Sequence, residues 1–557
     1  MNSFKQVSQK TVLLCIVLYR TVDIVLGLCA APLVVVIHAV LLQPDCPNHL
    51  KGHDSFACVC TEQQPCAQVV QPVRTSTGLV TKWESGRDGA RLRKQTLQFS
   101  KFSWWDLIAG FGRFHVGGGG SGGGGSGGGG RLHFRVNRNI LYQEIFGFGG
   151  AFTDSTGVNL QKIGTKLTDQ ILRDYFSSDG LEYNVGRIPI GGSDFSTRGY
   201  SLDDNPGDKS LAHFNLTHED LDYKIPYIQK AKQLATHEIR LYGSPWSAPA
   251  WMKTNDNLVH GGTLIGPVGS EYWQIYAKYF VKYLNAYKAH NISHWGLTVQ
   301  NEPAASQTWN SMRWTPESTR DFLVKNLGPE LERNGYGPDN LKVMIWDHNL
   351  DQVAEWVHTI FADKTAAKYA AGTAIHWYSN SPQTFLDKPY LEHPDKFILA
   401  TEACMEGGAK LGSWLAAERY AKDILEDLLH HTIGWTDWNL VLDTQGGPNW
   451  VGNFVDAPIL VDYSKQPHVY YRQPHYYALA HFSKFLPPGS VRIDTSIVDQ
   501  RNTGAIVGAF RTPNKSTVVI VVNNDNNDVE LTIEDTKTGR LVTTVAAKTI
   551  QTYVYYD

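Results

Sequence analysis

Net charge is what this sequence most clearly lacks. Its 557 residues hold 51 Lys and Arg against 54 Asp and Glu, which gives a formal net charge of −3. Proteins that bind nucleic acid do so through a basic surface that neutralises phosphates, and the composition offers no such excess. The chain is long, and 42% of it is hydrophobic, so it can bury a sizeable core. We therefore expect one large domain with smaller ones, and no nucleic-acid partner.

Cysteine is scarce, and the paired spacing of a zinc site is missing. Four of the seven cysteines lie close together near the N-terminus: Cys46, Cys58, Cys60 and Cys66. A structural zinc site usually shows C-x-x-C pairs, so this cluster predicts two disulfides instead. Disulfides persist in oxidising compartments, which indicates the secretory pathway. No motif for a cofactor or a metal is found, and we predict neither.

The N-terminal segment lacks a clear signal-peptide cleavage site of the A-x-A type. Residues 11–19 are apolar, and residues 24–42 contain no Asp, Glu, Lys or Arg. Residues 1–45 are therefore expected to be a signal peptide or a membrane anchor, although Pro32 and His38 weaken the spanning alternative. Three N-x-S/T sequons are compatible with glycosylation in the lumen, at Asn215, Asn291 and Asn514.

A glycine–serine run occupies residues 117–130, as four-glycine blocks separated by Ser121 and Ser126. It is not followed by Lys-Ser or Lys-Thr, so it is not a phosphate-binding loop. Such a run behaves as a flexible linker. We expect it within a set of N-terminal strands spanning 73–142, as a hairpin loop away from the chemistry.

From residue 143 onward, strand-like and helix-like stretches alternate. Eight short apolar runs each end in polar or aromatic residues, and helical stretches such as 271–288 and 414–429 separate them. Eight βα units in about 300 residues predict a (β/α)8 TIM barrel, built from residues 143–439 and 472–487. The eight predicted strands are 145–148, 185–190, 240–242, 296–300, 342–346, 373–375, 397–400 and 434–436.

Two of these strands deliver a glutamate to the same end of the barrel. Glu302 follows the fourth strand within Asn-Glu-Pro, and Glu402 follows the seventh. Retaining glycoside hydrolysis needs such a pair, one carboxyl protonated to assist the leaving oxygen and one ionised to attack the anomeric carbon. A salt bridge at the barrel rim is the alternative for either residue alone.

Beyond residue 488 the chain contains only strand signals. Residues 518–522 form a continuous apolar run, residues 523–526 form a turn, and residues 529–533 alternate between apolar and polar. These predict half of a β-sandwich over 488–557. The N-terminal strands of 73–142 are expected to complete it.

Three longer motifs resemble glycoside hydrolase family 30, and specifically its acid β-glucosidases, the glucosylceramidases. They are GFGGAFTD at 147–154, SPWSAPAWMKTN at 244–255 and GWTDWNL at 434–440. The resemblance runs from about Cys46 to Asp557 and fails at the targeting segment and at roughly 101–130. It implies cleavage of glucosylceramide in the lysosome lumen, helped by a saposin-type activator and anionic lipid. It also implies the disulfides Cys46–Cys58 and Cys60–Cys66, in a small β region of 46–72 joined by 440–471.

The resemblance assigns roles position by position. Glu302 matches the acid/base and Glu402 the nucleophile. The implied glucose-holding residues are Arg187, Asp194, Trp246, Asn301, Trp438 and Asn453, with His376 and Tyr378 as orienting neighbours. Asp194 can accept hydrogen bonds from two sugar hydroxyls, Asn301 can contact the 2-hydroxyl, and Arg187 can hold Glu402 ionised. Packing at the barrel rim is the alternative for each.

Burial and the charge of Glu402 are expected to raise the pKa of Glu302, so activity should be best on the acid side. Cys404 is expected to be a buried free thiol. The loop 304–314 is shorter than in the family, and only Trp309 offers an aromatic side chain for the lipid. A soluble β-glucoside or β-xyloside therefore stays open as the substrate. A non-catalytic, membrane-tethered sugar- or lipid-binding protein is the alternative from another class.

Overall fold

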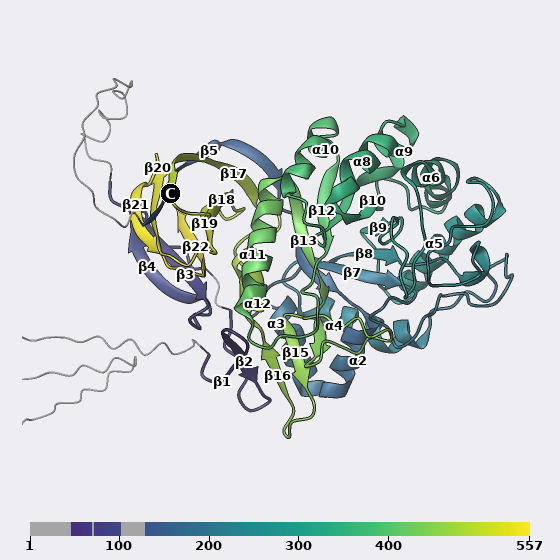
Figure 1. Ribbon diagram of the computed structural model, residues 1–557, viewed down its shortest axis with the longest axis horizontal. Coiled ribbons are helices and arrows are strands. Elements are labelled where there is room, and N and C mark those ends of the chain that lie inside the picture. The colour runs from purple at the N-terminus through teal and green to yellow at the C-terminus, as the bar shows by residue number, and fades with distance from the viewer. Residues whose placement is uncertain (1–45, 70–71, 102–128, 557) are drawn as a thin grey trace, which may run out of the picture.

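The computed structural model describes residues 46–69, 72–101 and 129–556 (Figure 1). The predicted targeting segment and the glycine–serine run up to residue 128 lie outside the described residues. Within the described ranges, no helix combines the length and the apolar character needed to cross a membrane.

A closed barrel of eight parallel strands forms the centre of the protein, so the predicted TIM barrel is confirmed (Figure 1). Each predicted strand overlaps an observed one, with ends that differ by a few residues. Their order around the barrel is β10-β11-β12-β13-β6-β7-β8-β9. The strands are β6 Gly147–Ala151, β7 Val185–Ile190, β8 Arg240–Pro245, β9 Gly296–Thr298, β10 Lys342–Asn349, β11 Ala370–His376, β12 Phe397–Glu402 and β13 Thr432–Asn439.

Helices surround the barrel and cover its strands with apolar faces. In α5 (Glu271–Ala289), Tyr276, Phe280, Tyr283 and Tyr287 recur at spacings of three and four residues and are all buried. This spacing places them on one side of a helix, so the aromatic side faces the barrel. The other α-helices are α2 Asp154–Ile163, α3 Thr165–Phe176, α4 Ile225–Leu234, α6 Pro316–Phe322, α7 Gly328–Arg333, α8 Val353–Phe361, α9 Lys364–Tyr369, α10 Asp387–Glu392, α11 Trp414–Leu429 and α12 Pro474–Ser483.

A five-stranded sheet of order β1-β2-β16-β15-β14 brings the N-terminal cysteines beside a much later part of the chain. The pairing implied by the resemblance is confirmed, because Cys46 is bonded to Cys58 and Cys60 to Cys66. Cys58 and Cys60 lie on β2 and are fully buried. The strands are β1 His49–Lys51, β2 Phe56–Cys60, β14 Val441–Asp443, β15 Ile459–Asp462 and β16 Val469–Arg472.

The N- and C-terminal strands combine, as predicted, but into one continuous nine-stranded sheet of order β21-β20-β5-β17-β18-β19-β22-β3-β4. The sheet curls around its own apolar core, which includes Phe134, Val519 and Tyr553 (Figure 1). Ser100, just after β4, exchanges two backbone hydrogen bonds with Arg540 of β21, so the two edges meet. The strands are β3 Leu79–Gly86, β4 Arg93–Gln98, β5 Gly130–Glu144, β17 Val491–Arg501, β18 Ile506–Arg511, β19 Ser516–Asn523, β20 Val529–Asp535, β21 Gly539–Val545 and β22 Thr549–Tyr556.

The prediction that residues 117–130 form a hairpin loop falls, up to residue 128, outside the described residues, and the strands on either side of this run, β4 and β5, are not neighbours in the sheet. A hairpin requires its two strands to be neighbours, but β4 lies at one edge of the sheet and β5 lies third from the other edge. Neighbours in sequence are not neighbours here because β5 pairs with β17 and β20 instead.

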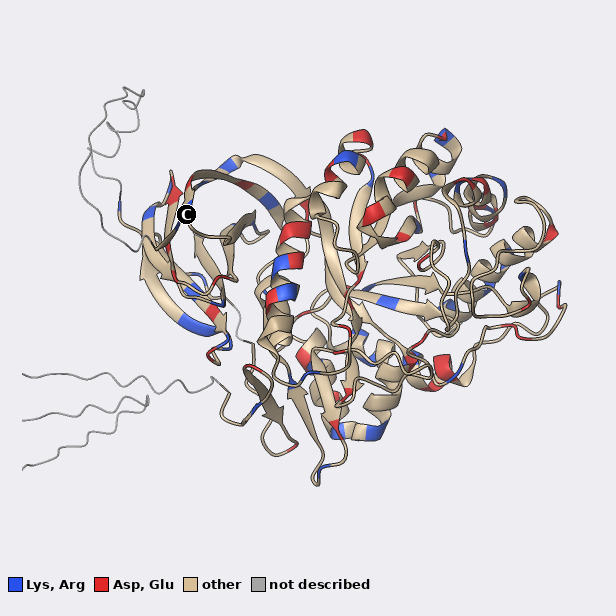
Figure 2. Ribbon diagram, viewed as in Figure 1, with Lys and Arg blue, Asp and Glu red and all other residues tan. Residues whose placement is uncertain are grey.

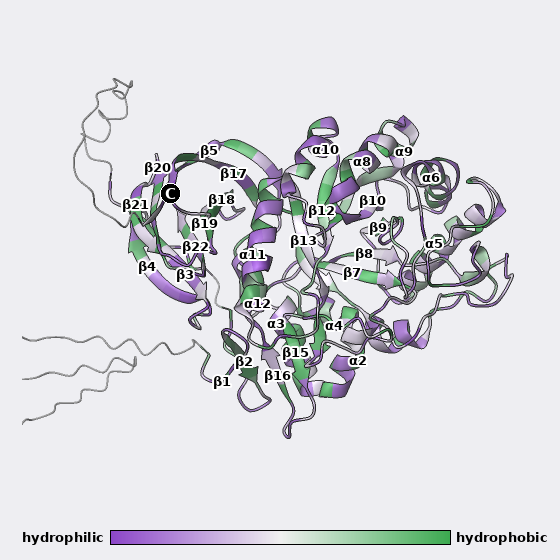
Figure 3. Ribbon diagram, viewed as in Figure 1, coloured by the Kyte–Doolittle hydropathy of each residue, from purple (hydrophilic) through white to green (hydrophobic). Residues whose placement is uncertain are grey.

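Helix α11 connects the barrel to the nine-stranded sheet. It contacts β13 on one side and β18, β19 and β22 on the other. Figure 2 shows acidic and basic residues intermingled along its visible face, and Figure 3 shows that this face is mostly hydrophilic. The two bodies therefore share a helix that buries apolar side chains such as Tyr420 and Leu425, together with the carboxyl groups of Glu418 and Asp427.

Candidate active site

The carboxyl ends of the barrel strands surround a pocket of about 230 Å³. Glu402 is the last residue of β12, and Glu302 follows β9. Glu302 and Asp347 have φ angles of 46° and 59°, in the left-handed region that side chains rarely adopt. Such backbone conformations persist where the surrounding structure holds them, and they cluster at functional sites.

The structure brings all ten predicted sugar-site residues to this end of the barrel. Eight of them line the pocket: Asp194, Trp246, Asn301, Glu302, Tyr378, Glu402, Trp438 and Asn453. The other two, Arg187 and His376, are buried directly behind it and contact the pocket-lining carboxylates. Their roles stay predictions, but their convergence is observed.

Both oxygens of Glu402 are held. Arg187 Nη1 donates to Oε2, and Tyr378 Oη donates to Oε1 at 3.0 Å. Arg187 also donates through Nη2 to Asn301 Oδ1 at 2.8 Å, and its guanidinium lies 4.8 Å from the centre of the Trp246 ring. The carboxylate therefore has a single orientation toward the pocket, as a nucleophile requires.

Asp347 is the centre of this network, and sequence reasoning missed it as a site residue. It is fully buried and accepts hydrogen bonds from Arg187, Thr298, Thr401 and His376 at 2.7–3.1 Å. Burial raises its pKa, but the charge of Arg187 and the hydrogen bonds outweigh burial and hold the pKa below its ordinary value. The available signal was its place directly after an apolar strand, which it shares with Glu402.

Asp194 and two tryptophans, Trp246 and Trp438, line part of the pocket. Asn449 and Asn453 donate to Asp194 Oδ2 at 3.2 and 3.0 Å, which leaves its other oxygen without an observed donor among the described residues. Trp246 and Trp438 stack with ring centres 5.1 Å apart. A carboxylate beside stacked apolar rings suits a ring compound that carries hydroxyls.

The pKa directions correct one prediction. Burial raises the pKa of Glu302, but His376 and His348 beside it outweigh burial and lower that pKa. The expected rise is therefore wrong, because sequence reasoning did not place two imidazoles next to this carboxyl. Burial opposes protonation of His376, yet the charge of Glu402 and the bond to Asp347 raise its pKa to about 9. Burial also raises the pKa of Glu402. The proton nearest to Glu302 thus lies on His376.

Other pocket residues were seen less clearly or not at all from the sequence. His348 and Gln307 lie beside Glu302, with Gln307 Nε2 donating to Glu302 Oε2 at 3.5 Å. Trp309 lines the pocket, where the sequence marked it only as a substitute aromatic. The prediction for Cys404 is confirmed, since it is buried and bears no disulfide. Burial raises the pKa of its thiol, so it is inert as a nucleophile.

Replacing Arg187 with Ala is expected to lower the free energy of unfolding by about 3–5 kcal/mol, because it leaves two buried carboxylates without their cation. Arg187→Lys keeps the charge but not the planar fork, so it should recover part of the stability. Arg135→Ala is a matched control, since this arginine is exposed and pairs with Glu534 at the surface. Urea unfolding measures all three. A wild-type midpoint for Arg187→Ala would contradict the role of the buried network.

The pKa of Asp194 predicts a pH-dependent difference in stability. Burial, together with the charge of Glu402 and against the bonds from Asn453 and Asn449, raises this pKa from 3.8 to about 7. Between these two pKa values the folded protein keeps a proton on Asp194 that the unfolded chain has released. The free energy of unfolding therefore falls as the pH rises from about 4 to about 7. Asp194→Asn removes this loss. Its stability relative to wild type should increase between about pH 4 and pH 8, by up to about 4 kcal/mol. A constant difference across that range would contradict the raised pKa.

Comparison with known proteins decides the family. The model of the glycosyl hydrolase family 30 TIM-barrel domain matches residues 145–486, and that of the family 30 beta sandwich domain matches residues 489–553. The chain belongs to glycosyl hydrolase family 30. Residues 145–486 include all eight barrel strands and both rim glutamates, so the match covers the whole candidate site.

Similar family 30 proteins cover nearly the full length. The chain is 44% identical to "Putative glucosylceramidase 3" of Caenorhabditis elegans, over 90% of this chain and 96% of that protein. It is 35% identical to "Lysosomal acid glucosylceramidase" of Mus musculus, over 92% and 96%. Among solved structures it resembles SrfJ from Salmonella typhimurium, with a TM-score of 0.76 and 29% identity over 86% of this chain and 100% of that chain. This family 30 enzyme is therefore a glycoside hydrolase.

Proposed function

We propose that this family 30 enzyme is a retaining β-glucosidase that hydrolyses glucosylceramide to glucose and ceramide, with Glu402 as nucleophile and Glu302 as acid/base. The observation that carries the proposal is the fixed orientation of Glu402. Arg187 and Tyr378 bind its two oxygens, and Glu302 lines the same pocket. The names of the two glucosylceramidase relatives support the choice of substrate.

The reaction proceeds by two displacements. Glu402 attacks the anomeric carbon and forms an ester with glucose, while the bond to the ceramide oxygen breaks and Glu302 gives that oxygen its proton. Water then attacks the same carbon. Glu302 takes a proton from the water, the ester bond breaks, and Glu402 leaves as a carboxylate. His376, which lies 3.7 Å from Glu302 and carries a proton near neutral pH, can pass that proton to Glu302 before the first displacement and take it back after the second.

The pocket suits one sugar ring. Its volume of about 230 Å³ is below the roughly 300–1,000 Å³ of sites for larger ligands, so the ceramide part lies outside it. Asp194 binds two hydroxyls, with Asn453 in support, and Asn301 holds the 2-hydroxyl. Trp246 and Trp438 contact the apolar face of the sugar. Trp309, at the pocket wall, lies where the sugar meets its lipid.

We place this activity in the lysosome lumen, reached through the secretory pathway. The two disulfides fit an oxidising compartment, and the asparagines of all three sequons are exposed. A saposin-type activator and anionic lipid would present the membrane-bound substrate. These partners rest on the resemblance to the glucosylceramidases.

Labelling with a cyclitol-epoxide glucose analogue, followed by peptide mass spectrometry, tests the proposal. The label is expected on Glu402. The substrate is tested separately, by comparing kcat/KM for glucosylceramide in anionic vesicles with that for a soluble β-glucoside and a β-xyloside. A higher kcat/KM for either soluble substrate would support the same retaining mechanism but would show that glucosylceramide is not the preferred substrate. A folded protein that takes no label would favour a sugar- or lipid-binding role.

A further inference from the structure

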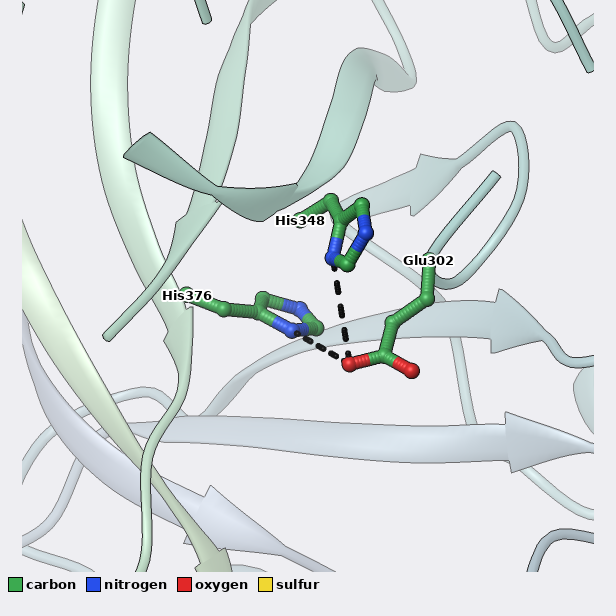
Figure 4. Close-up of side chains that lie close together, drawn as sticks. All are labelled: Glu302, His348 and His376. Atoms are coloured by element: carbon green, nitrogen blue, oxygen red, sulfur yellow. Dashed lines mark ion pairs between the residues drawn. The ribbon is translucent and has the colours of Figure 1, made fainter. Parts of the chain in front are cut away.

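Two histidines point at the same oxygen of Glu302 (Figure 4). His376 Nδ1 lies 3.7 Å from Glu302 Oε1, and His348 Nδ1 lies 3.8 Å from it. One ligand atom from each of the three residues falls within 4.8 Å of the other two. The three side chains come from different barrel strands or their ends: Glu302 follows β9, His348 lies on β10 and His376 ends β11. They therefore form a cluster held by the barrel and not by one flexible loop.

The two nitrogens are buried, and each makes a long ion pair with Glu302 Oε1 in place of a hydrogen bond. Neither His348 Nδ1 nor His376 Nδ1 has a hydrogen-bond partner among the residues that the structure describes. The side chain of His376 is 0% exposed and that of His348 is 13% exposed. Buried polar atoms are nearly always hydrogen-bonded, and ion pairs of 3.7 and 3.8 Å leave room for a group that binds between the two nitrogens and the carboxylate oxygen.

The spacing suits a transition-metal ion of the zinc class. Zn²⁺ takes imidazole nitrogen and carboxylate oxygen at about 2.0–2.2 Å, which in a tetrahedral site separates neighbouring ligand atoms by about 3.4 Å. The distances of 3.7 and 3.8 Å from Glu302 Oε1 exceed this by a few tenths of an ångström, and the three ligand atoms all lie within 4.8 Å of one another, so binding requires the side chains to close around the ion. Three protein ligands leave a fourth position open toward the pocket, for water.

The surroundings orient one ligand as metal sites require. His376 Nε2 lies 3.1 Å from Asp347 Oδ1, and the carboxylate of Asp347 accepts its proton. This directs Nδ1 toward Glu302, and a carboxylate behind a histidine is the usual support for a metal-bound imidazole. Burial lowers the pKa of His348, which favours the neutral imidazole that binds metals. A bound metal displaces the Nδ1 proton of His376, as metals do from protonated ligands.

We propose that Glu302, His348 and His376 form a binding site for one Zn²⁺-class divalent ion, which inhibits the enzyme by occupying its acid/base. A metal bound to Glu302 Oε1 removes the oxygen that carries the proton to the leaving group. The binding site itself follows from the geometry. The inhibition rests on the proposed function of Glu302.

Isothermal titration calorimetry of the full-length protein with ZnCl2 tests the binding site, and Co²⁺ visible absorption reports ligand geometry. Wild type is expected to bind one ion at this site. His348→Ala and Glu302→Gln should each weaken that binding by about 100-fold or more, because each removes a ligand. His358→Ala is the matched control, since this exposed histidine lies elsewhere and pairs with Glu392. Thermal unfolding without metal identifies a variant that has lost its fold. If one of the two ligand variants is unfolded, the zinc affinity of the other tests the site.

Equal zinc affinity in wild type and both folded variants would overturn the proposal, as would the absence of binding in wild type. Inhibition is measured separately, with an activated aryl β-glucoside and with glucosylceramide. Zinc should inhibit hydrolysis of glucosylceramide more strongly, since departure of ceramide depends on the acid. If the protein binds zinc at this site but cleaves neither substrate, the proposed function fails while the site stands. If it cleaves both and zinc has no effect at saturating occupancy, the inhibition is wrong.

Discussion

Replacing Glu402 with Gln is expected to lower kcat/KM for glucosylceramide by about 10⁴-fold or more, as loss of a catalytic nucleophile does in other hydrolases. Glutamine has nearly the same shape but cannot form the ester with the anomeric carbon. Hydrolysis is measured by release of ceramide. Glu355→Gln, an exposed glutamate on α8, is the matched control and should keep wild-type activity.

Chemical rescue separates loss of the nucleophile from loss of the fold. In Glu402→Ala, azide can enter the space left by the carboxylate and attack the sugar directly, so the product should be the α-glucosyl azide with inverted configuration. Because this needs an otherwise intact site, rescue also reports that the protein is folded. Wild-type turnover by Glu402→Gln would refute its role as nucleophile.

The second large effect is expected for Glu302→Gln, and its size should depend on the leaving group. With glucosylceramide, kcat/KM should fall by about 10²–10⁴-fold, because the alkoxide of ceramide leaves poorly without a proton. With a dinitrophenyl β-glucoside the first step should change little, because that leaving group departs as a stable anion. Steady-state and burst kinetics on both substrates measure the difference.

The same two substrates also test whether Glu302 is the acid/base. Equal losses on both would show that the residue positions the sugar and does not donate a proton. In Glu302→Ala, azide should rescue the second step and give the β-glucosyl azide, since it attacks the ester on Glu402 from the side of Glu302. An α-glucosyl azide from this variant would show that Glu302 is the nucleophile and Glu402 the acid/base.

The lowered pKa of Glu302 bears on how this residue acts as an acid. His376 and His348 stabilise the Glu302 carboxylate, so the reaction begins from a pair in which the imidazole of His376 holds the proton. Substrate must exclude water and weaken this pairing before Glu302 can act as an acid. The expected preference for acidic pH is therefore retained, with a reason that differs from burial alone.

Much of the fold could be predicted because barrel strands carry local signals. Each of the eight strands is a short apolar run that ends in polar residues, and helices such as α5 and α11 repeat apolar residues every three or four positions. These patterns report the burial of one element at a time. The strand order of the nine-stranded sheet was harder to predict, because the partners of β5 are β17 and β20, which lie hundreds of residues away in sequence. Pairing over that distance leaves no local trace.

By itself, the sequence determined the barrel and the two glutamates at its rim, and its motifs predicted the sugar-site residues. Only the tertiary structure decided what those residues touch. Asp347 became the centre of a network because the barrel closes Arg187, Thr401 and His376 around it. His348 reached Glu302 because β10 and the end of β9 are neighbours. Distances between strands and the pKa values they set depend on barrel closure and on the sum of nearby charges, and neither can be read from residues in a line.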